Sequence, residues 1–165
     1  MTRQEVYEIC KRVAPMHGYD PLLILAILTQ ESTYDPSRPR VEQGYLIKYV
    51  VKNKNDARVR KARPHVQSML ATSFGLGQMM GLSLYELGFI ASLDSATVAR
   101  ALDGYDDNKE LQVDLTCQWL SKKWKEGNGT LTDALRRYNG GADYPPLIMG
   151  HLKDLQEAVK KGELK

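Results

Sequence analysis

Glu31 is the residue whose position in the sequence best suits acid–base chemistry. It lies in the last turn of a helix predicted over residues 21–32, in which residues 22–28 are apolar throughout. A carboxylate there meets the negative end of the helix dipole and is partly removed from water, and both effects raise the pKa of a carboxyl group. A carboxyl group that stays protonated near neutral pH can protonate the leaving oxygen of a glycosidic bond. The alternative is an exposed glutamate at a fraying helix end, and position alone favours that alternative.

Two later segments favour the catalytic interpretation of Glu31 over the exposed helix end. Residues 30–32 read Gln-Glu-Ser, residues 73–80 read Ser-Phe-Gly-Leu-Gly-Gln-Met-Met, and residues 137–141 read Arg-Tyr-Asn-Gly-Gly. With these three segments in this order on a helical background, the chain resembles the lytic transglycosylase family, whose catalytic domain is similar to goose-type lysozyme. The likeness runs from about residue 5 to about residue 155.

The resemblance implies a role for each matching residue. Glu31 is the implied catalytic acid and base, and the hydroxyl of Tyr138 is expected to point toward Glu31 or the N-acetyl group of the muramic acid. The implied substrate-binding residues along the cleft are Ser73, Gln78, Met80, Tyr138, Asn139 and Tyr144. Structural alternatives exist: Met80 as a core residue, Tyr138 as a packed aromatic, and Asn139 as a helix cap before Gly140.

The chain departs from the family pattern at two glycines. Gly77 stands where the family has methionine, which is expected to loosen the turn and to remove a side chain from the cleft. Gly140 stands where the family has alanine. Neither change removes a group that performs chemistry.

The number of acidic groups bears on the mechanism. In the family that the chain resembles, one glutamate protonates the glycosidic oxygen, the N-acetyl group stabilises the developing cation, and the same glutamate deprotonates the 6-hydroxyl, giving a 1,6-anhydromuramic product. Glu42, in an Arg-x-Glu stretch similar to one in some family members, and Asp35 are the candidate second carboxylates. If one of them holds a water molecule, the enzyme is a hydrolase. The motifs favour cleavage of the MurNAc–GlcNAc β-1,4 bond by a transglycosylase; a hydrolytic lysozyme and a non-catalytic peptidoglycan-binding virion module are the alternatives.

The elements that must position these residues are helical. Helical periodicity or capping signals predict helices over residues 2–16, 21–32, 45–51, 65–70, 95–102, 106–126, 130–138 and 146–161, with a further one ending near residue 88. No strand pattern of useful length and no repeat occurs. We therefore predict an all-α protein in which residues 1–165 form a single compact, lysozyme-like domain around one buried central helix, residues 21–32.

Composition narrows the function classes. The chain has 165 residues, 42% of them hydrophobic and 26% charged, which suits one soluble globular domain. Cys10 and Cys117 are far apart in sequence and are expected to be unpaired core thiols, and the three scattered histidines give no zinc pattern. We expect no metal and no cofactor.

The remaining expectations concern partners and location. A basic segment, residues 52–63, lacks interleaved aromatic residues, so a solvated loop is favoured over a nucleic-acid arm. We expect peptidoglycan glycan strands as the partner, no nucleic acid, no membrane insertion and a monomer. The opening residues lack a signal-peptide pattern. This favours a phage lysin or virion-associated lysin, made in the host cytoplasm and acting on the cell wall in the periplasm.

Overall fold

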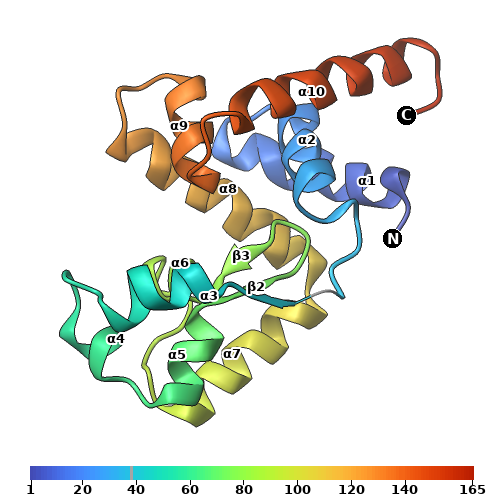
Figure 1. The fold of residues 1–165 in the computed structure, drawn as a ribbon. Coiled ribbons are helices and arrows are strands. Elements are labelled where there is room, and N and C mark those ends of the chain that lie inside the picture. Colours follow the sequence, from blue (N-terminus) through green and yellow to red (C-terminus); the bar gives the residue numbers. More distant parts are fainter. Residues whose placement is uncertain (38) are drawn as a thin grey trace.

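The computed structural model describes residues 1–37 and 39–165, and helices account for most of them (Figure 1). The predicted all-α class is confirmed. The helices form two groups with α8 (Lys109–Glu126) running between them. The first group holds both termini and consists of α1 (Arg3–Val13), the 3-10 turn η1 (Ala14–His17), α2 (Pro21–Ser32), α9 (Leu131–Asn139) and α10 (Tyr144–Lys160).

The second group contains shorter helices and a small sheet. Its elements are β1 (Arg40–Val41), α3 (Gln43–Tyr45), the π-helical turn η2 (Leu46–Val51), α4 (Ala57–Lys61), α5 (Pro64–Leu70), β2 (Thr72–Phe74), β3 (Met79–Met80), α6 (Gly81–Glu86) and α7 (Ser95–Asp107). The strands are antiparallel in the order β1-β2-β3, with Ser73 opposite Arg40 on one side and Met80 on the other. The sequence did not predict this sheet, because strands of two or three residues are too short to show an alternating pattern.

Helix α2 begins and ends at signals in its own sequence. The Asp20 carboxylate accepts a hydrogen bond from the Leu22 amide at 2.7 Å, Pro21 occupies the first turn, and residues 23–28 are buried. The helix ends in two successive left-handed residues, Thr33 at φ 50° and Tyr34 at φ 66°. Such angles are costly for a β-branched residue and are sustained only where the surroundings hold them.

Tyr34 supplies that support. Its side chain is buried, its hydroxyl lies 2.5 Å from the Thr29 hydroxyl, and its carbonyl accepts a hydrogen bond from the amino group of Met1 at 3.2 Å. The chain is therefore fixed three residues after Glu31, which holds the last turn of α2 in place.

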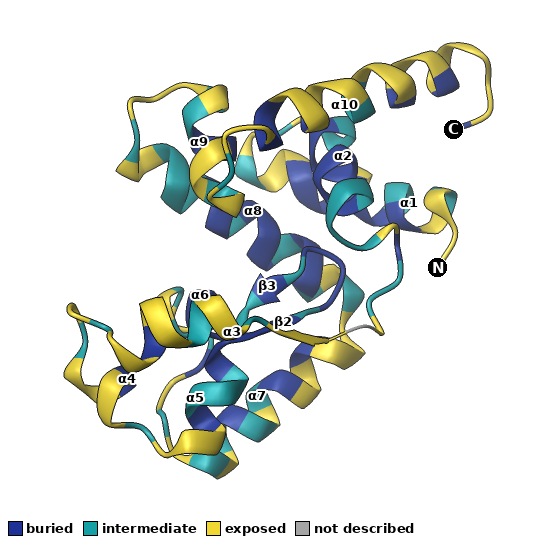
Figure 2. Ribbon diagram, viewed as in Figure 1, coloured by how far each residue is buried: buried dark blue, intermediate teal, exposed yellow. Residues whose placement is uncertain are grey.

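The buried side chains form two clusters that share α8 (Figure 2). Val113, Cys117 and Leu120 pack with α1, α2 and α10, whereas Leu115 and Trp119 pack with the second group. The expected central helix, α2, lies at the centre of the first cluster, and α8 contributes to both. Cys10 and Cys117 are buried and unpaired, as predicted. Within the described residues, no helix is long and apolar enough to cross a membrane.

The basic segment 52–63 is not a plain loop. Helix α4 lies within it, capped by the Asp56 carboxylate, which accepts a hydrogen bond from the Arg58 amide at 2.8 Å and from the Arg58 guanidinium at 2.8 Å. The remaining lysines and arginines of the segment are exposed.

Candidate active site

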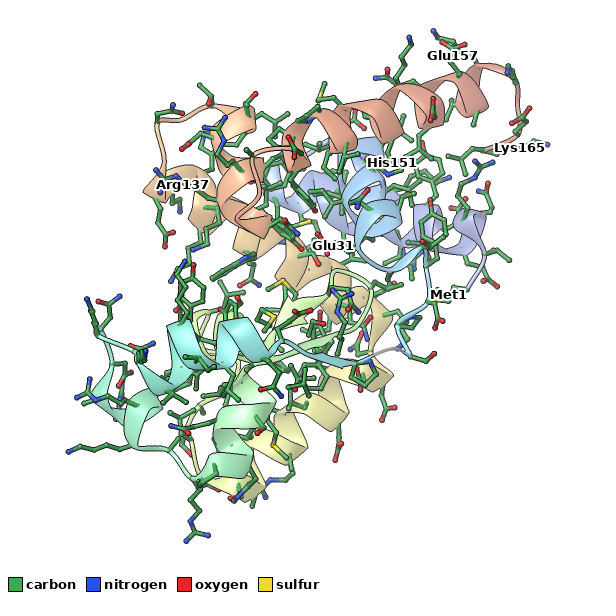
Figure 3. All side chains as sticks on the ribbon, in the orientation of Figure 1. Met1, Glu31, Arg137, His151, Glu157 and Lys165 are labelled. Atoms are coloured by element: carbon green, nitrogen blue, oxygen red, sulfur yellow. The ribbon has the colours of Figure 1, made fainter. Side chains whose placement is uncertain are left out.

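A cleft of about 680 Å³ lies between the two groups of helices, and Glu31 is on its wall. Figure 3 places Glu31 where the first group faces the second. The residues that line the cleft are Glu31, Arg40, Glu42, Tyr45, Tyr49, Asn53, Asn55, Ser73, Gln78, Met80, Leu82, Ser83, Glu86, Trp119, Lys123, Glu126, Arg137, Tyr138, Asn139 and Gly140. The sequence motifs thus meet at one site, although they are separated by more than a hundred positions.

The carboxyl group of Glu31 is partly buried and is not exposed at a fraying helix end. Burial of the carboxyl group raises its pKa from the ordinary 4.5 to about 6. Hydrogen bonds from Tyr144 and Asn139 and the positive charge of Arg40 lower the pKa, but they do not cancel the effect of burial. A substantial fraction of Glu31 is therefore protonated at slightly acid pH, so the residue can both donate and accept a proton.

Tyr144 is the tyrosine that contacts Glu31. Its hydroxyl donates a hydrogen bond to Glu31 Oε1 at 2.5 Å, and its side chain is buried rather than exposed in the cleft. The ring stacks on that of Tyr138, with centroids 6.0 Å apart and planes at 9°. Tyr144 was expected to bind substrate along the cleft, but it is not among the residues that line the cleft, and its hydroxyl contacts Glu31.

Tyr138 lines the cleft, but its hydroxyl does not meet Glu31. It donates a hydrogen bond to the Gly77 carbonyl at 3.0 Å and lies 3.7 Å from the Met79 sulfur. Of the two expected partners of this hydroxyl, Glu31 is contacted by Tyr144 instead, and a contact with the N-acetyl group of the muramic acid stays a prediction. Tyr138 instead ties α9 to the loop between β2 and β3.

Gly77 does not loosen that loop. A side chain at this position would overlap the hydroxyl of Thr116 on α8, so glycine permits the loop to pack directly on the helix. The buried Gln112 secures the same loop: its Oε1 accepts from the Leu76 amide at 2.9 Å, and its Nε2 donates to the Tyr105 carbonyl at 2.9 Å. The expectation of a looser turn is wrong, because the loop can pack this closely on α8 only when residue 77 has no side chain.

Ser73, Gln78 and Met80 line the cleft from the small sheet and its loop. Gln78 has the left-handed φ of 44°, and its amide is engaged within the loop: Oε1 accepts from the Ser73 hydroxyl at 2.9 Å and Nε2 donates to the Gly75 carbonyl at 3.0 Å. The Ser73 hydroxyl also lies 3.3 Å from the Arg40 carbonyl. These side chains form part of the cleft wall. The hydrogen bonds of Ser73 and Gln78 also stabilise the loop between β2 and β3.

Of the two candidate second carboxylates, only one lies on the wall of the cleft. Glu42 lines the cleft and accepts a hydrogen bond from Arg40 Nε at 2.6 Å. Asp35 is not among the lining residues, and its carboxylate accepts hydrogen bonds from the Ser37 amide at 3.1 Å and the Ser37 hydroxyl at 2.5 Å. Glu42 is therefore the stronger candidate for a second carboxylate beside the substrate.

Several lining residues were not predicted from the sequence. Glu86 and Glu126 add carboxylates, and Tyr45 and Tyr49 form an aromatic pair with centroids 4.7 Å apart. The spacing of four between these tyrosines is a signal that the sequence offered, since residues four apart share a helix face. Trp119, by contrast, reads as one more core position of α8.

No metal-binding arrangement is evident at the site. Within residues 1–37 and 39–165, no three histidine, cysteine, aspartate or glutamate side chains are grouped so that they could hold a metal ion.

The contact between Tyr144 and Glu31 makes a testable prediction. Because the Tyr144 hydrogen bond favours the ionised carboxylate, Tyr144→Phe should raise the pKa of Glu31 further and move the alkaline limb of the pH–activity profile upward. Measurement of kcat/KM against pH in the wild-type protein and the variant checks this.

Tyr138→Phe is the matched control, since it removes a hydroxyl from the stacked partner ring without touching Glu31. Its alkaline limb should stay at the wild-type position. If the two variants shift the profile equally, Tyr144 has no specific effect on Glu31.

Comparison of the chain with protein-family models, with curated proteins and with solved structures found no match.

Proposed function

We propose that the protein cleaves the β-1,4 bond between N-acetylmuramic acid and N-acetylglucosamine in peptidoglycan, as a lytic transglycosylase. The observation that carries this proposal is Glu31 itself: a carboxyl group with a pKa of about 6 on the wall of a long cleft, oriented by the Tyr144 hydroxyl. The motifs around residues 31, 73–80 and 137–141, which resemble those of lytic transglycosylases, all contribute to this cleft.

The proposed reaction uses Glu31 twice. Tyr144 donates a hydrogen bond to Oε1, and Asn139 also hydrogen-bonds to the carboxyl group. In the first step the protonated carboxyl group supplies its proton. That proton passes to the glycosidic oxygen as the bond to C1 breaks, and the N-acetyl group stabilises the positive charge at C1. The Glu31 carboxylate then takes the proton of the 6-hydroxyl as this oxygen bonds to C1. The products are a 1,6-anhydromuramic end and a free hydroxyl on the leaving sugar, with Glu31 protonated again.

Glu42 gives hydrolysis a specific basis as the second candidate. Its carboxylate is in the same cleft and is held by Arg40, so it could position a water molecule for attack on C1. The leaving-group chemistry at Glu31 is the same in both reactions, and only the acceptor differs.

The products distinguish the two reactions. Digestion of purified sacculi, followed by borohydride labelling and mass spectrometry, should yield 1,6-anhydromuramic ends without new reducing ends. Reducing ends that accumulate in step with lysis would identify water as the acceptor and assign Glu42 to it. If no soluble fragments form although the protein binds the sacculi, a binding module is the correct description and the proposed activity is wrong.

A further inference from the structure

The α8–α9 end of the cleft carries two cations, Lys123 and Arg137, which we call the cationic pair. Figure 3 shows Arg137 toward this end, away from Glu31. The Lys123 ammonium lies 4.0 Å from the centroid of the Trp119 ring and 2.7 Å from Glu126 Oε2, and its side chain is only 15% exposed. A lysine held in this way has lost most of its freedom before any ligand arrives.

Arg137 is more exposed than Lys123, with 47% of its side chain accessible, and one ion pair anchors it. Its Nε donates a hydrogen bond to Asp133 Oδ2 at 2.8 Å, and the same oxygen accepts from the Asn128 amide at 3.1 Å. Gly127 permits this arrangement, since a side chain there would overlap the Asp133 carboxylate. The guanidinium is thus fixed at the cleft wall by its Nε.

Both cations keep donors for a further ligand. An ammonium group has three N–H donors and a guanidinium has five. Within the described residues, the hydrogen bonds of these side chains are one from Lys123 to Glu126 and one from Arg137 to Asp133. An incoming carboxylate can therefore bind without displacing either partner. Glu126, Asp133 and Glu86 offset the two positive charges, so the free N–H donors, rather than a net positive charge, are what this end of the cleft offers to an anion.

We infer that the cationic pair binds the carboxylates of the peptide stems, so that the enzyme acts on glycan that carries peptides rather than on bare glycan. This inference rests on the proposed function. The sugars of a peptide-bearing strand are neutral, because the lactyl carboxyl group of each muramic acid is bound to its peptide as an amide. The tyrosine pair and Asn55 offer these sugars stacking and hydrogen-bonding groups. Two fixed cations are suited instead to an anion, and the acidic groups of this substrate are on its peptides.

The chain contains matched controls for this pair. Lys122 and Arg136 precede Lys123 and Arg137 directly, but neither lines the cleft. Lys122 pairs with Glu86 at 3.6 Å and Glu126 at 3.8 Å, and Arg136 is exposed. The double variants Lys123→Met/Arg137→Met and Lys122→Met/Arg136→Met therefore remove the same charge from adjacent positions.

The experiment compares two ligands: soluble peptide-bearing glycan strands, and bare strands, from which an amidase has removed the peptides and in which the lactyl carboxylates that this exposes have been capped as neutral amides. Binding is measured by calorimetry with each double variant in a Glu31→Gln background, and turnover with Glu31 intact. For Lys123→Met/Arg137→Met we expect Kd and KM for the peptide-bearing strands to rise about tenfold or more, with little change for bare strands. The control variant should match its parent on both ligands.

Charge-conserving Lys123→Arg and Arg137→Lys should restore most of the affinity, which separates loss of charge from loss of fold. Equal weakening for both ligands, or an unchanged Kd for the peptide-bearing strands, would overturn the inference. A protein that binds peptide-bearing strands through the cationic pair but cleaves neither ligand would overturn the proposed function and leave the inference standing.

Discussion

Glu31→Gln should lower the rate of cell-wall lysis by roughly 10³-fold or more, because the proposed reaction needs this one group both to give and to take a proton. Glutamine keeps the shape of the side chain and can still accept the Tyr144 hydrogen bond. It cannot transfer the proton. The decrease in turbidity of purified cell walls measures the effect, and a rate near that of the wild type would remove Glu31 from the mechanism.

Measuring the stability of Glu31→Gln tests whether its loss of activity comes from the missing proton transfer or from a damaged fold. The folded protein raises the pKa of Glu31 from 4.5 to about 6, so the native state holds a proton that the unfolded chain has released. The free energy of unfolding contributed by this group therefore falls as pH rises from about 4.5 through 6. Glu31→Gln avoids this cost, so at pH 8 it should be more stable than the wild type by on the order of 1–2 kcal/mol, and nearly equal to it at pH 4.

Thermal unfolding at the two pH values measures this difference. A lower melting temperature for the variant at pH 8 would show that Glu31 supports the fold and would make its loss of activity ambiguous. Glu42→Gln is the companion variant: it should keep most of the lytic activity if the 6-hydroxyl is the acceptor, and lose it if water is.

The activity of the wild type should fall about tenfold per pH unit above the pKa of Glu31. With that pKa near 6, about 1% of the carboxyl groups remain protonated at pH 8, so kcat/KM should be roughly 100-fold below its plateau. The direction follows from the role: a general acid must begin protonated, and burial determines where it loses its proton.

The measurement is kcat/KM on soluble glycan strands from pH 4 to 9 at constant ionic strength. The Arg136→Met variant serves as a charge control, because Arg136 is exposed and does not line the cleft. A limb at the ordinary glutamate value near 4.5, or activity that rises through pH 8, would mean that Glu31 does not act as the acid.

The sequence by itself determined the helices and the position of Glu31, because both depend on local interactions. The capping box of Thr2 with Glu5 and the cap of Asp20 before Pro21 form as their spacing predicts. The apolar run that follows places α2 in the core. The sequence placed Glu31 in the last turn of this helix, where a raised pKa is possible, but position alone favoured an exposed carboxyl group. The burial that raises the pKa comes from the tertiary structure.

Tertiary structure alone decided which groups surround that carboxyl. Tyr144 rather than Tyr138 reaches Glu31, and this depends on how α10 packs against α2 and how α9 packs against α8 and α10. The role of Gly77 depends on Thr116, about forty positions later in the chain. The cationic pair could not be identified from the sequence, because only the structure shows that residues 123 and 137 lie on the cleft wall and residues 122 and 136 do not. Contacts between distant segments result from the packing of whole helices, and local sequence patterns do not predict this packing.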